Sequence, residues 1–169
     1  TNKSDNLITA DDDFTAVLCR DLILQEYINS KIVSLRANAL SGKSGYFTTL
    51  PTVYEISKYV IRDELDDKKI IDSELPPQGD QELYRRALEE FWPVFLTISA
   101  YADSIENPDE EDDKKRADIR EHSINCRPIA QRAIAEAIIN CQKVAEHRIE
   151  FTEAVNRLNS LDWSPENDL

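Results

Sequence analysis

The chain has 169 residues, of which 41% are hydrophobic, and its formal net charge at pH 7 is -13. This length fits one domain with a buried core, and three glycines and seven prolines are too few for a disordered or turn-rich all-β chain. No apolar run approaches the roughly 18–20 residues that span a membrane, and the polar start has no signal peptide. We therefore expect a cytoplasmic protein with no membrane partner.

The chain has no methionine, even at position 1, and it stops abruptly after "DWSPENDL". Residues 1–169 are therefore interpreted as a single helical domain that is part of a larger protein.

The three cysteines, Cys19, Cys126 and Cys141, are an odd number without CxxC spacing. This pattern is typical of buried free thiols in a reducing compartment. The two histidines, His122 and His147, have no paired cysteines beside them, so no zinc site is expected.

A first helix is predicted over residues 11–28, where three aspartates suit the N-terminal turn and apolar residues follow at helical spacing. "KIVSL" is compatible with a short extended segment, and "SGKSG" with a loop. A second helix begins at "TTLPTVYEISKYVI", with Thr49 as N-cap, Pro51 in the first turn, and Phe47 and Leu50 packing inward.

A third, long helix is predicted from about Asp80 to about Ser104, kinked or split by Pro93. Its uncharged run "FWPVFLTISAYA" is expected to form the centre of the core. Residues 103–113 then hold seven acidic residues and are interpreted as a solvated loop. Because this loop lacks the ligand spacing of a calcium-binding loop, no metal site is expected there.

A fourth helix, "RADIREHSI", leads into an acid-free window from His122 to Ala135. Pro128 starts a fifth helix, for which the expected inward residues are Ile129, Ala133, Ala137, Ile138 and Cys141. A short last helix and a tail anchored by Trp163 follow. The predicted fold is mostly α: an irregular orthogonal bundle of about five helices with little or no β-structure.

The sequence offers no catalytic site, since it contains no GxSxG, Walker or HExxH motif. "SGKSG" superficially resembles a phosphate loop, but Ala37 stands where the first glycine is required. His122 beside Glu121 allows general base chemistry, although a helix-end histidine with a local hydrogen bond is favoured. No catalytic residue, metal or cofactor is therefore predicted.

The most unusual stretch is residues 27–54, which contain no acid and carry a charge of +3, so that the rest of the chain carries -16. Lysine and arginine side chains, serine and glycine N–H groups and a helix N-terminus are all suited to phosphate contacts. The alternative is a loop folded against the chain's own carboxylates. The overall negative charge also opposes strong non-specific DNA binding.

Four stretches together resemble one family: "SLRANALSGKSGYFTTLPTVYEISKYV", "FWPVF", "ADIREHSINCRPIAQRAIAEAI" and "LNSLDWSPENDL". In order and spacing they are similar to segments of DndB-type proteins, members of the DGQHR-domain family, from about residue 5 onward. The resemblance covers only the C-terminal half of such proteins, without their Asp-Gly-Gln-His-Arg motif, and none of the four stretches is a catalytic signature.

The resemblance implies a DNA-associated accessory or transcriptional regulatory protein of a bacterial DNA phosphorothioation or related defence system, with DNA and other components of that system as partners. The candidate DNA contacts are Arg36, Lys43 and Ser44, their polar neighbours Asn38 and Ser41, and Arg127 and Arg132 from the second acid-free window. Whether the two groups face one another depends on how the bundle folds.

Two alternatives stay open at this point. One is a helical protein–protein interaction module without nucleic-acid contact, whose acidic residues 103–113 form the partner surface or a solubilising loop. The other, an enzyme, is the weakest. The sequence leaves the oligomeric state open.

Overall fold

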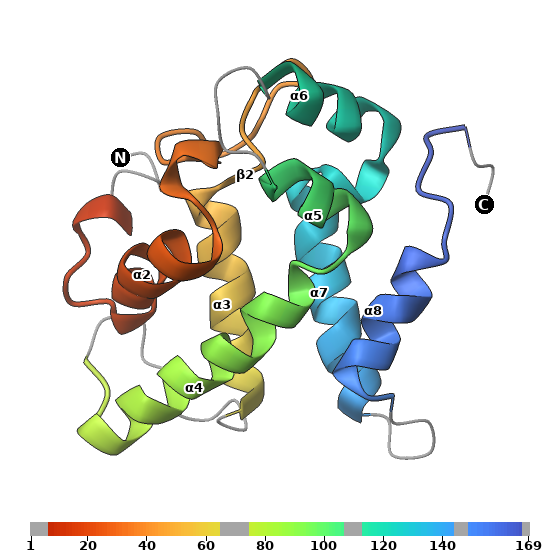
Figure 1. The fold of residues 1–169 in the computed structure, drawn as a ribbon. Coiled ribbons are helices and arrows are strands. Elements are labelled where there is room, and N and C mark those ends of the chain that lie inside the picture. The colour runs from red at the N-terminus through yellow and green to blue at the C-terminus, as the bar shows by residue number, and fades with distance from the viewer. Residues whose placement is uncertain (1–6, 65–74, 107–112, 144–148, 167–169) are drawn as a thin grey trace.

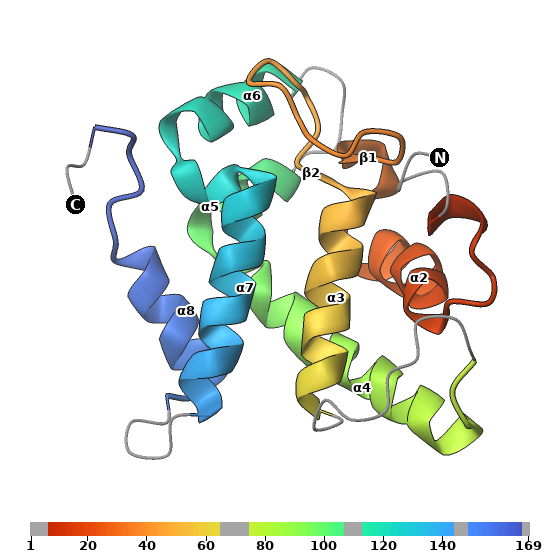
Figure 2. The ribbon, with the colours of Figure 1, turned by 180° about the vertical axis from the view of Figure 1, so that it is seen from behind.

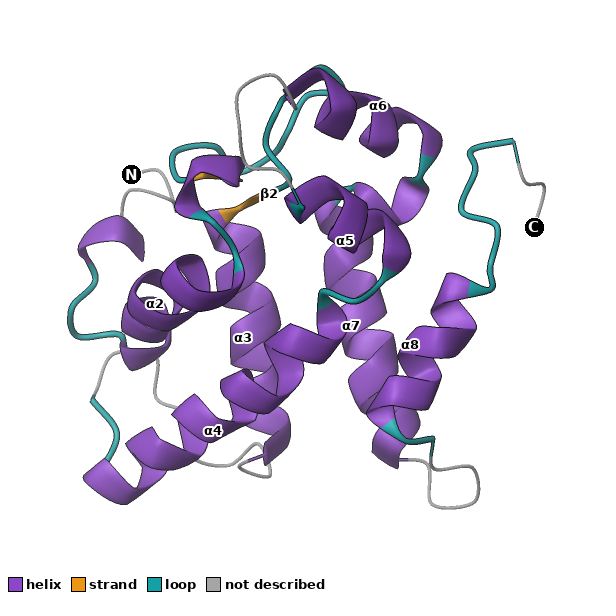
Figure 3. Ribbon diagram, viewed as in Figure 1, coloured by secondary structure: helices purple, strands orange, loops and turns teal. Residues whose placement is uncertain are grey.

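A computed structural model of the chain describes residues 7–64, 75–106, 113–143 and 149–166. Figure 3 shows that these residues are mainly helical, and their only sheet is a pair of two-residue strands. The prediction of a mostly α fold is therefore confirmed. The described helices are more numerous than the five expected, mainly because a turn after Phe95 divides the predicted third helix and a short helix, α8 (Phe151–Asn159), ends the fold.

After a helical stretch at residues 7–9, helix α2 covers Phe14–Leu18 and continues without a break as a π-helix, Cys19–Tyr27. The Asp13 side chain caps it by accepting a hydrogen bond from the Ala16 N–H at 3.0 Å. A 3-10 turn, Ser30–Ile32, then leads into strand β1, Val33–Ser34. The predicted helix over residues 11–28 and the extended segment in "KIVSL" are thus both present.

Strand β2, Thr48–Thr49, pairs with β1 in parallel and leads directly into α3, Leu50–Glu64. Thr49 acts as the predicted N-cap, since its Oγ1 accepts a hydrogen bond from the Thr52 N–H at 3.3 Å. Phe47 and Leu50 are buried, as expected.

The predicted long third helix is two helices, α4 (Gln78–Phe95) and α5 (Ser99–Ile105). Pro93 lies inside α4, and the chain turns after Phe95. The predicted run, residues 91–102, spans the end of α4 and most of α5. It contributes to the centre of the core as predicted, and the ring centroids of Phe95 and Tyr101 lie 5.3 Å apart. Trp92 is also buried, and its Nε1–H donates to Ser57 Oγ on α3 at 3.1 Å.

The second half of the chain contains α6 (Asp113–His122), a 3-10 turn (Ile124–Cys126), α7 (Pro128–Lys143) and α8 (Phe151–Asn159). Figures 1 and 2 show α3 and α7 side by side, both beginning at the end of the molecule where α6 lies.

The predicted inward face of α7 is wrong except at Ile138. Ile129 is 77% exposed, and Ala133, Ala137 and Cys141 are exposed as well. The face that packs against α3 and α8 instead consists of Gln131, Ile134, Ala135, Ile138 and Ile139.

The tail after α8 is anchored as expected, because the Ile124 N–H donates to the Trp163 carbonyl at 2.9 Å. Cys19 and Cys126 are buried free thiols, but Cys141 is exposed, contrary to the prediction. None of the helices in the described ranges combines the length and apolarity needed to cross a bilayer. Of the acidic segment at 103–113, residues 107–112 lie outside the described part of the chain.

Candidate functional site

The basic stretch singled out in the sequence is the connection between β1 and β2. Parallel strands cannot be joined by a tight turn and require a crossover of about a dozen residues or more. Residues 35–47, called the crossover loop below, form this connection, and Figure 2 shows it reaching from the small sheet to α6. The parallel pairing therefore explains why a long loop with few apolar anchors projects at this end of the molecule.

Two buried arginines of α6 hold the second half of the crossover loop. Arg116 Nε donates to the Gly45 carbonyl. Arg120 donates to the Ser44 carbonyl at 2.7 Å and to the Tyr46 carbonyl. The two arginines are four residues apart and therefore project from the same face of α6. Three consecutive carbonyls of the loop, at positions 44–46, are thus satisfied by cationic side chains.

Arg120 retains positive charge in a buried place. The residue is 4% exposed, and its Nε has no hydrogen-bond partner. Burial lowers the pKa of the Arg120 guanidinium, and the nearby Arg116 lowers it further. An arginine stays protonated despite such a shift, so its charge contributes to the local potential at neutral pH.

Gln131, in the first turns of α7, fixes the end of the crossover loop. Its Oε1 accepts from the Thr48 hydroxyl at 2.7 Å. Its Nε2 lies 3.3 Å from both the Phe47 and the Cys126 carbonyls. All three contacts are buried, so the loop and the start of α7 are held together by one side chain that bonds at every polar atom.

The crossover loop, the end of α6 and the starts of α3 and α7 line an open pocket of about 750 Å³. Its lining includes four cationic side chains, Lys43, Arg120, Arg127 and Arg132, and one carboxylate, Glu121. The two acid-free windows of the sequence therefore meet at one place in the fold, although more than 80 residues separate Lys43 from Arg127.

The exposed cations of the pocket form no ion pair within the part of the chain that the structure describes. Among the described residues, no carboxylate forms an ion pair with Lys43, Arg127 or Arg132. For Lys43, this observation disfavours the interpretation in which the loop folds against the chain's own carboxylates.

Helix ends add to the positive potential. Thr52 in the first turn of α3 and Pro128 at the start of α7 both line the pocket. The N-terminus of an α-helix carries a partial positive charge and N–H groups without intrahelical partners. Within α7 the Gln131 N–H donates to the Arg127 carbonyl at 2.9 Å, and Pro128 has no N–H, so the N–H groups of Ile129 and Ala130 are the ones that lack an acceptor within the helix.

Four of the seven residues predicted from the sequence line the pocket: Asn38, Lys43, Arg127 and Arg132. Arg36, Ser41 and Ser44 do not. Ser44 uses its carbonyl to accept from Arg120, and its Oγ lies 3.4 Å from the Tyr46 N–H.

Sequence reasoning missed Arg120, Glu121, Thr52 and Ile129, which also line the pocket. The i, i+4 spacing of Arg116 and Arg120 was a usable signal, because it places two arginines on one face of a helix. The exposure of Ile129 had no comparable signal.

His122 fits the simpler of its two interpretations. It is the last residue of α6, and its Nδ1 lies 2.9 Å from the Asp118 carbonyl and 3.4 Å from the Asp118 carboxylate. The backbone contact and then this carboxylate raise the pKa of His122. Within the described ranges, no three His, Cys, Asp or Glu side chains are placed to hold a metal ion.

Comparison of the chain with protein-family models, with curated proteins and with solved structures gave no match in any of the three.

Proposed function

We propose that this protein binds DNA through the pocket between the crossover loop and α7, as an accessory or transcriptional regulatory protein of a DNA phosphorothioation or related defence system. The resemblance to DndB-type proteins supplies the biological setting. The physical support comes from the pocket itself, and it is the stronger of the two.

One observation carries the proposal: two stretches free of acidic residues, far apart in sequence, line one pocket whose exposed cations have no carboxylate partner among the described residues. In a chain of net charge -13, this concentrates positive charge on one face. Such segregation steers a polyanion toward that face and away from the rest of the surface. Phosphate oxygens are the natural ligands of lysine, arginine and helix N-termini.

The test is DNA binding over a salt series, for the protein and for two variants that lose the same charge. Lys43→Ala/Arg132→Ala removes two pocket cations. Lys31→Ala/Arg62→Ala removes two exposed cations that do not line the pocket. Each lost phosphate contact lowers the slope of log K against log[salt] by about 0.9, so the pocket variant is expected to lose about 1.8 and the control almost nothing.

Equal slopes for the two variants would contradict the proposal, because any loss would then reflect net charge alone. Absence of DNA binding by the unaltered protein would also contradict it and would favour a protein-interaction module.

A further inference from the structure

The pocket contains features that a phosphate backbone does not need. Its walls include four apolar residues: Ala39, Leu40, Pro128 and Ile129. Ile129 is 77% exposed although it is a large aliphatic residue on a helix with a well-packed opposite face. A phosphate gains nothing from an aliphatic wall, whereas a flat base or a sugar buries apolar surface against one.

The polar lining is also mixed. Glu121 brings a carboxylate into a pocket with four cations, and it repels a phosphate. A carboxylate at this place favours a ligand that presents hydrogen-bond donors in addition to its anion, such as the amino group of a base or the hydroxyl of a sugar. Asn38, on the crossover loop, adds an amide that both donates and accepts.

The size of the pocket also favours a small molecule with a base or sugar over a phosphate backbone. A volume of about 750 Å³ lies within the range of pockets that enclose small molecules. Contacts to a duplex backbone are made on open surfaces and helix ends, and they require no concave space of this volume. The lining combines cationic and aliphatic side chains, and this combination suits a ligand with an anionic end and an apolar body.

We propose that the pocket holds one phosphorylated nucleoside unit. Its phosphate lies against Lys43, Arg127 and Arg132, its base packs on Leu40 and Ile129, and its polar edge faces Asn38 and Glu121. The unit has two sources, a free mononucleotide or an unpaired or terminal nucleotide of a single strand. For the second source the inference rests on the function proposed above, since it specifies which form of nucleic acid the pocket takes.

The experiment measures displacement and direct binding with defined probes. The probes are the four deoxynucleoside 5′-monophosphates, the matching unphosphorylated nucleosides, inorganic phosphate, a fluorescent 12-residue single strand and the corresponding duplex. We expect the monophosphates to bind at least about tenfold more tightly than inorganic phosphate or the nucleosides, because only they engage both parts of the pocket.

A matched pair of variants tests the aliphatic wall. Ile129→Ser removes the exposed side chain in the pocket, and Ile124→Ser removes an isoleucine that is 37% exposed and does not line it. The first is expected to weaken monophosphate binding about tenfold and the second to leave it unchanged. Glu121→Gln is expected to change the order of preference among the four bases, a readout that a change in folding stability would not produce.

The source is identified by the strands. If single strands bind and are displaced by monophosphates, the pocket takes a nucleotide of a strand. If monophosphates bind and neither strand does, the pocket takes free nucleotides, and the DNA function fails while the pocket assignment holds. If the duplex binds through Lys43 and Arg132 but monophosphates neither bind nor displace it, the assignment is overturned and the DNA function stands. Equal effects of Ile129→Ser and Ile124→Ser also overturn it.

Discussion

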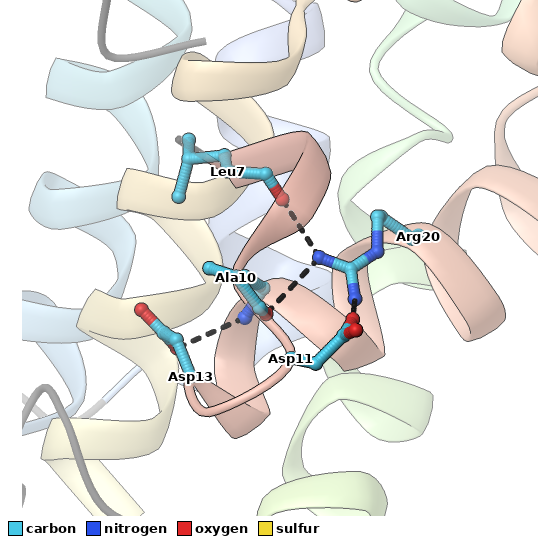
Figure 4. A network of polar contacts seen from close by, with 6 residues as sticks. Leu7, Ala10, Asp11, Asp13 and Arg20 are labelled. Carbon is cyan, nitrogen blue, oxygen red and sulfur yellow. Dashed lines mark hydrogen bonds and ion pairs between the residues drawn. The ribbon is translucent and has the colours of Figure 1, made fainter. Parts of the chain in front are cut away.

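Two regions of this molecule use an arginine to hold a nearby loop by its carbonyl groups, and they differ in what becomes of the charge. Near the N-terminus, Arg20 donates to the Leu7 carbonyl at 2.7 Å and to the Ala10 carbonyl at 3.2 Å, as Figure 4 shows. Its second nitrogen forms an ion pair with Asp11 at 2.9 Å. At the other region, Arg120 donates to the Ser44 and Tyr46 carbonyls and pairs with no described carboxylate.

The same arrangement, an arginine that donates to backbone carbonyls, therefore leaves different electrostatic potentials at the two places. At Arg20 the positive charge is balanced by Asp11, so the N-terminal loop has no excess positive potential. At Arg120 the carbonyls satisfy hydrogen bonds but supply no compensating full charge, and the potential is left to the pocket beside it. Holding a loop and charging a site are therefore separable roles of a buried arginine.

The sharpest test of this comparison is to remove each guanidinium and keep the aliphatic stem. Arg120→Met leaves two buried carbonyls without donors, at about 1–3 kcal/mol each, so we expect a loss of about 3 kcal/mol in the free energy of unfolding. Arg20→Met is expected to cost about 1 kcal/mol, because water reaches its more exposed surroundings, where the Arg20 side chain is 19% exposed. Urea denaturation of both variants measures the two values, and equal losses would refute the distinction.

Alkaline pH probes the cysteine that lies beside each arginine. Burial raises the pKa of Cys19 to about 12 and that of Cys126 to about 11, and the nearby arginine lowers each pKa only in part. An unfolded thiol titrates near pH 9.0. Above that pH the unfolded state loses its protons first, so the stability that is fully present below pH 9 falls as the pH rises toward 11 and 12.

The measurement is the urea midpoint at pH 8, 9 and 10, with Cys19→Ala and Cys126→Ala as the variants. Each thiol contributes a loss of about 1 kcal/mol per pH unit above 9, so each variant is expected to show a shallower decline than the unaltered protein. A decline that both substitutions leave unchanged would show that other groups cause it.

The smallest expected effect is that of the carboxylate which balances Arg20. Asp11→Ala removes an ion pair whose acidic side chain is 90% exposed, and such pairs contribute about 0.5 kcal/mol or less. Asp12→Ala is the control, because Asp12 is an exposed neighbour of the same charge. The difference between the two thermal midpoints should vanish in about 1 M salt, where charges are screened within a few ångströms. A persistent large difference would mean that Asp11 holds the loop directly.

Much of the fold follows from local sequence patterns, such as the caps at Asp13 and Thr49 and the aromatic core around Trp92. The inward face of α7 does not follow from such a pattern. Its buried stripe begins with Gln131, a polar residue, whereas the apolar Ile129 at the start of the same helix is exposed, so the apolar pattern predicts the wrong face. The need for a buried amide arises from the carbonyls of the crossover loop, which are distant in sequence.

Part of the candidate site was also predictable from the sequence. Lys43 and Arg132 were recognised because their windows lack acids, a property visible along the chain. Their meeting in one pocket depends on α3 and α7 starting at the same end of the molecule. Arg120 was not recognised, because its importance comes from the Ser44 and Tyr46 carbonyls that it contacts.

The anchoring of the crossover loop also affects the energetics of binding. Loops that recruit ligands often become ordered only on contact, and the lost conformational freedom weakens the affinity. Here the stretch from Ser44 to Thr49 is tied to α6 by Arg116 and Arg120, to α7 by Gln131 and to β1 by strand pairing. The pocket wall that carries Lys43 is therefore preorganised next to this stretch, and a ligand that enters encounters a shape that already exists.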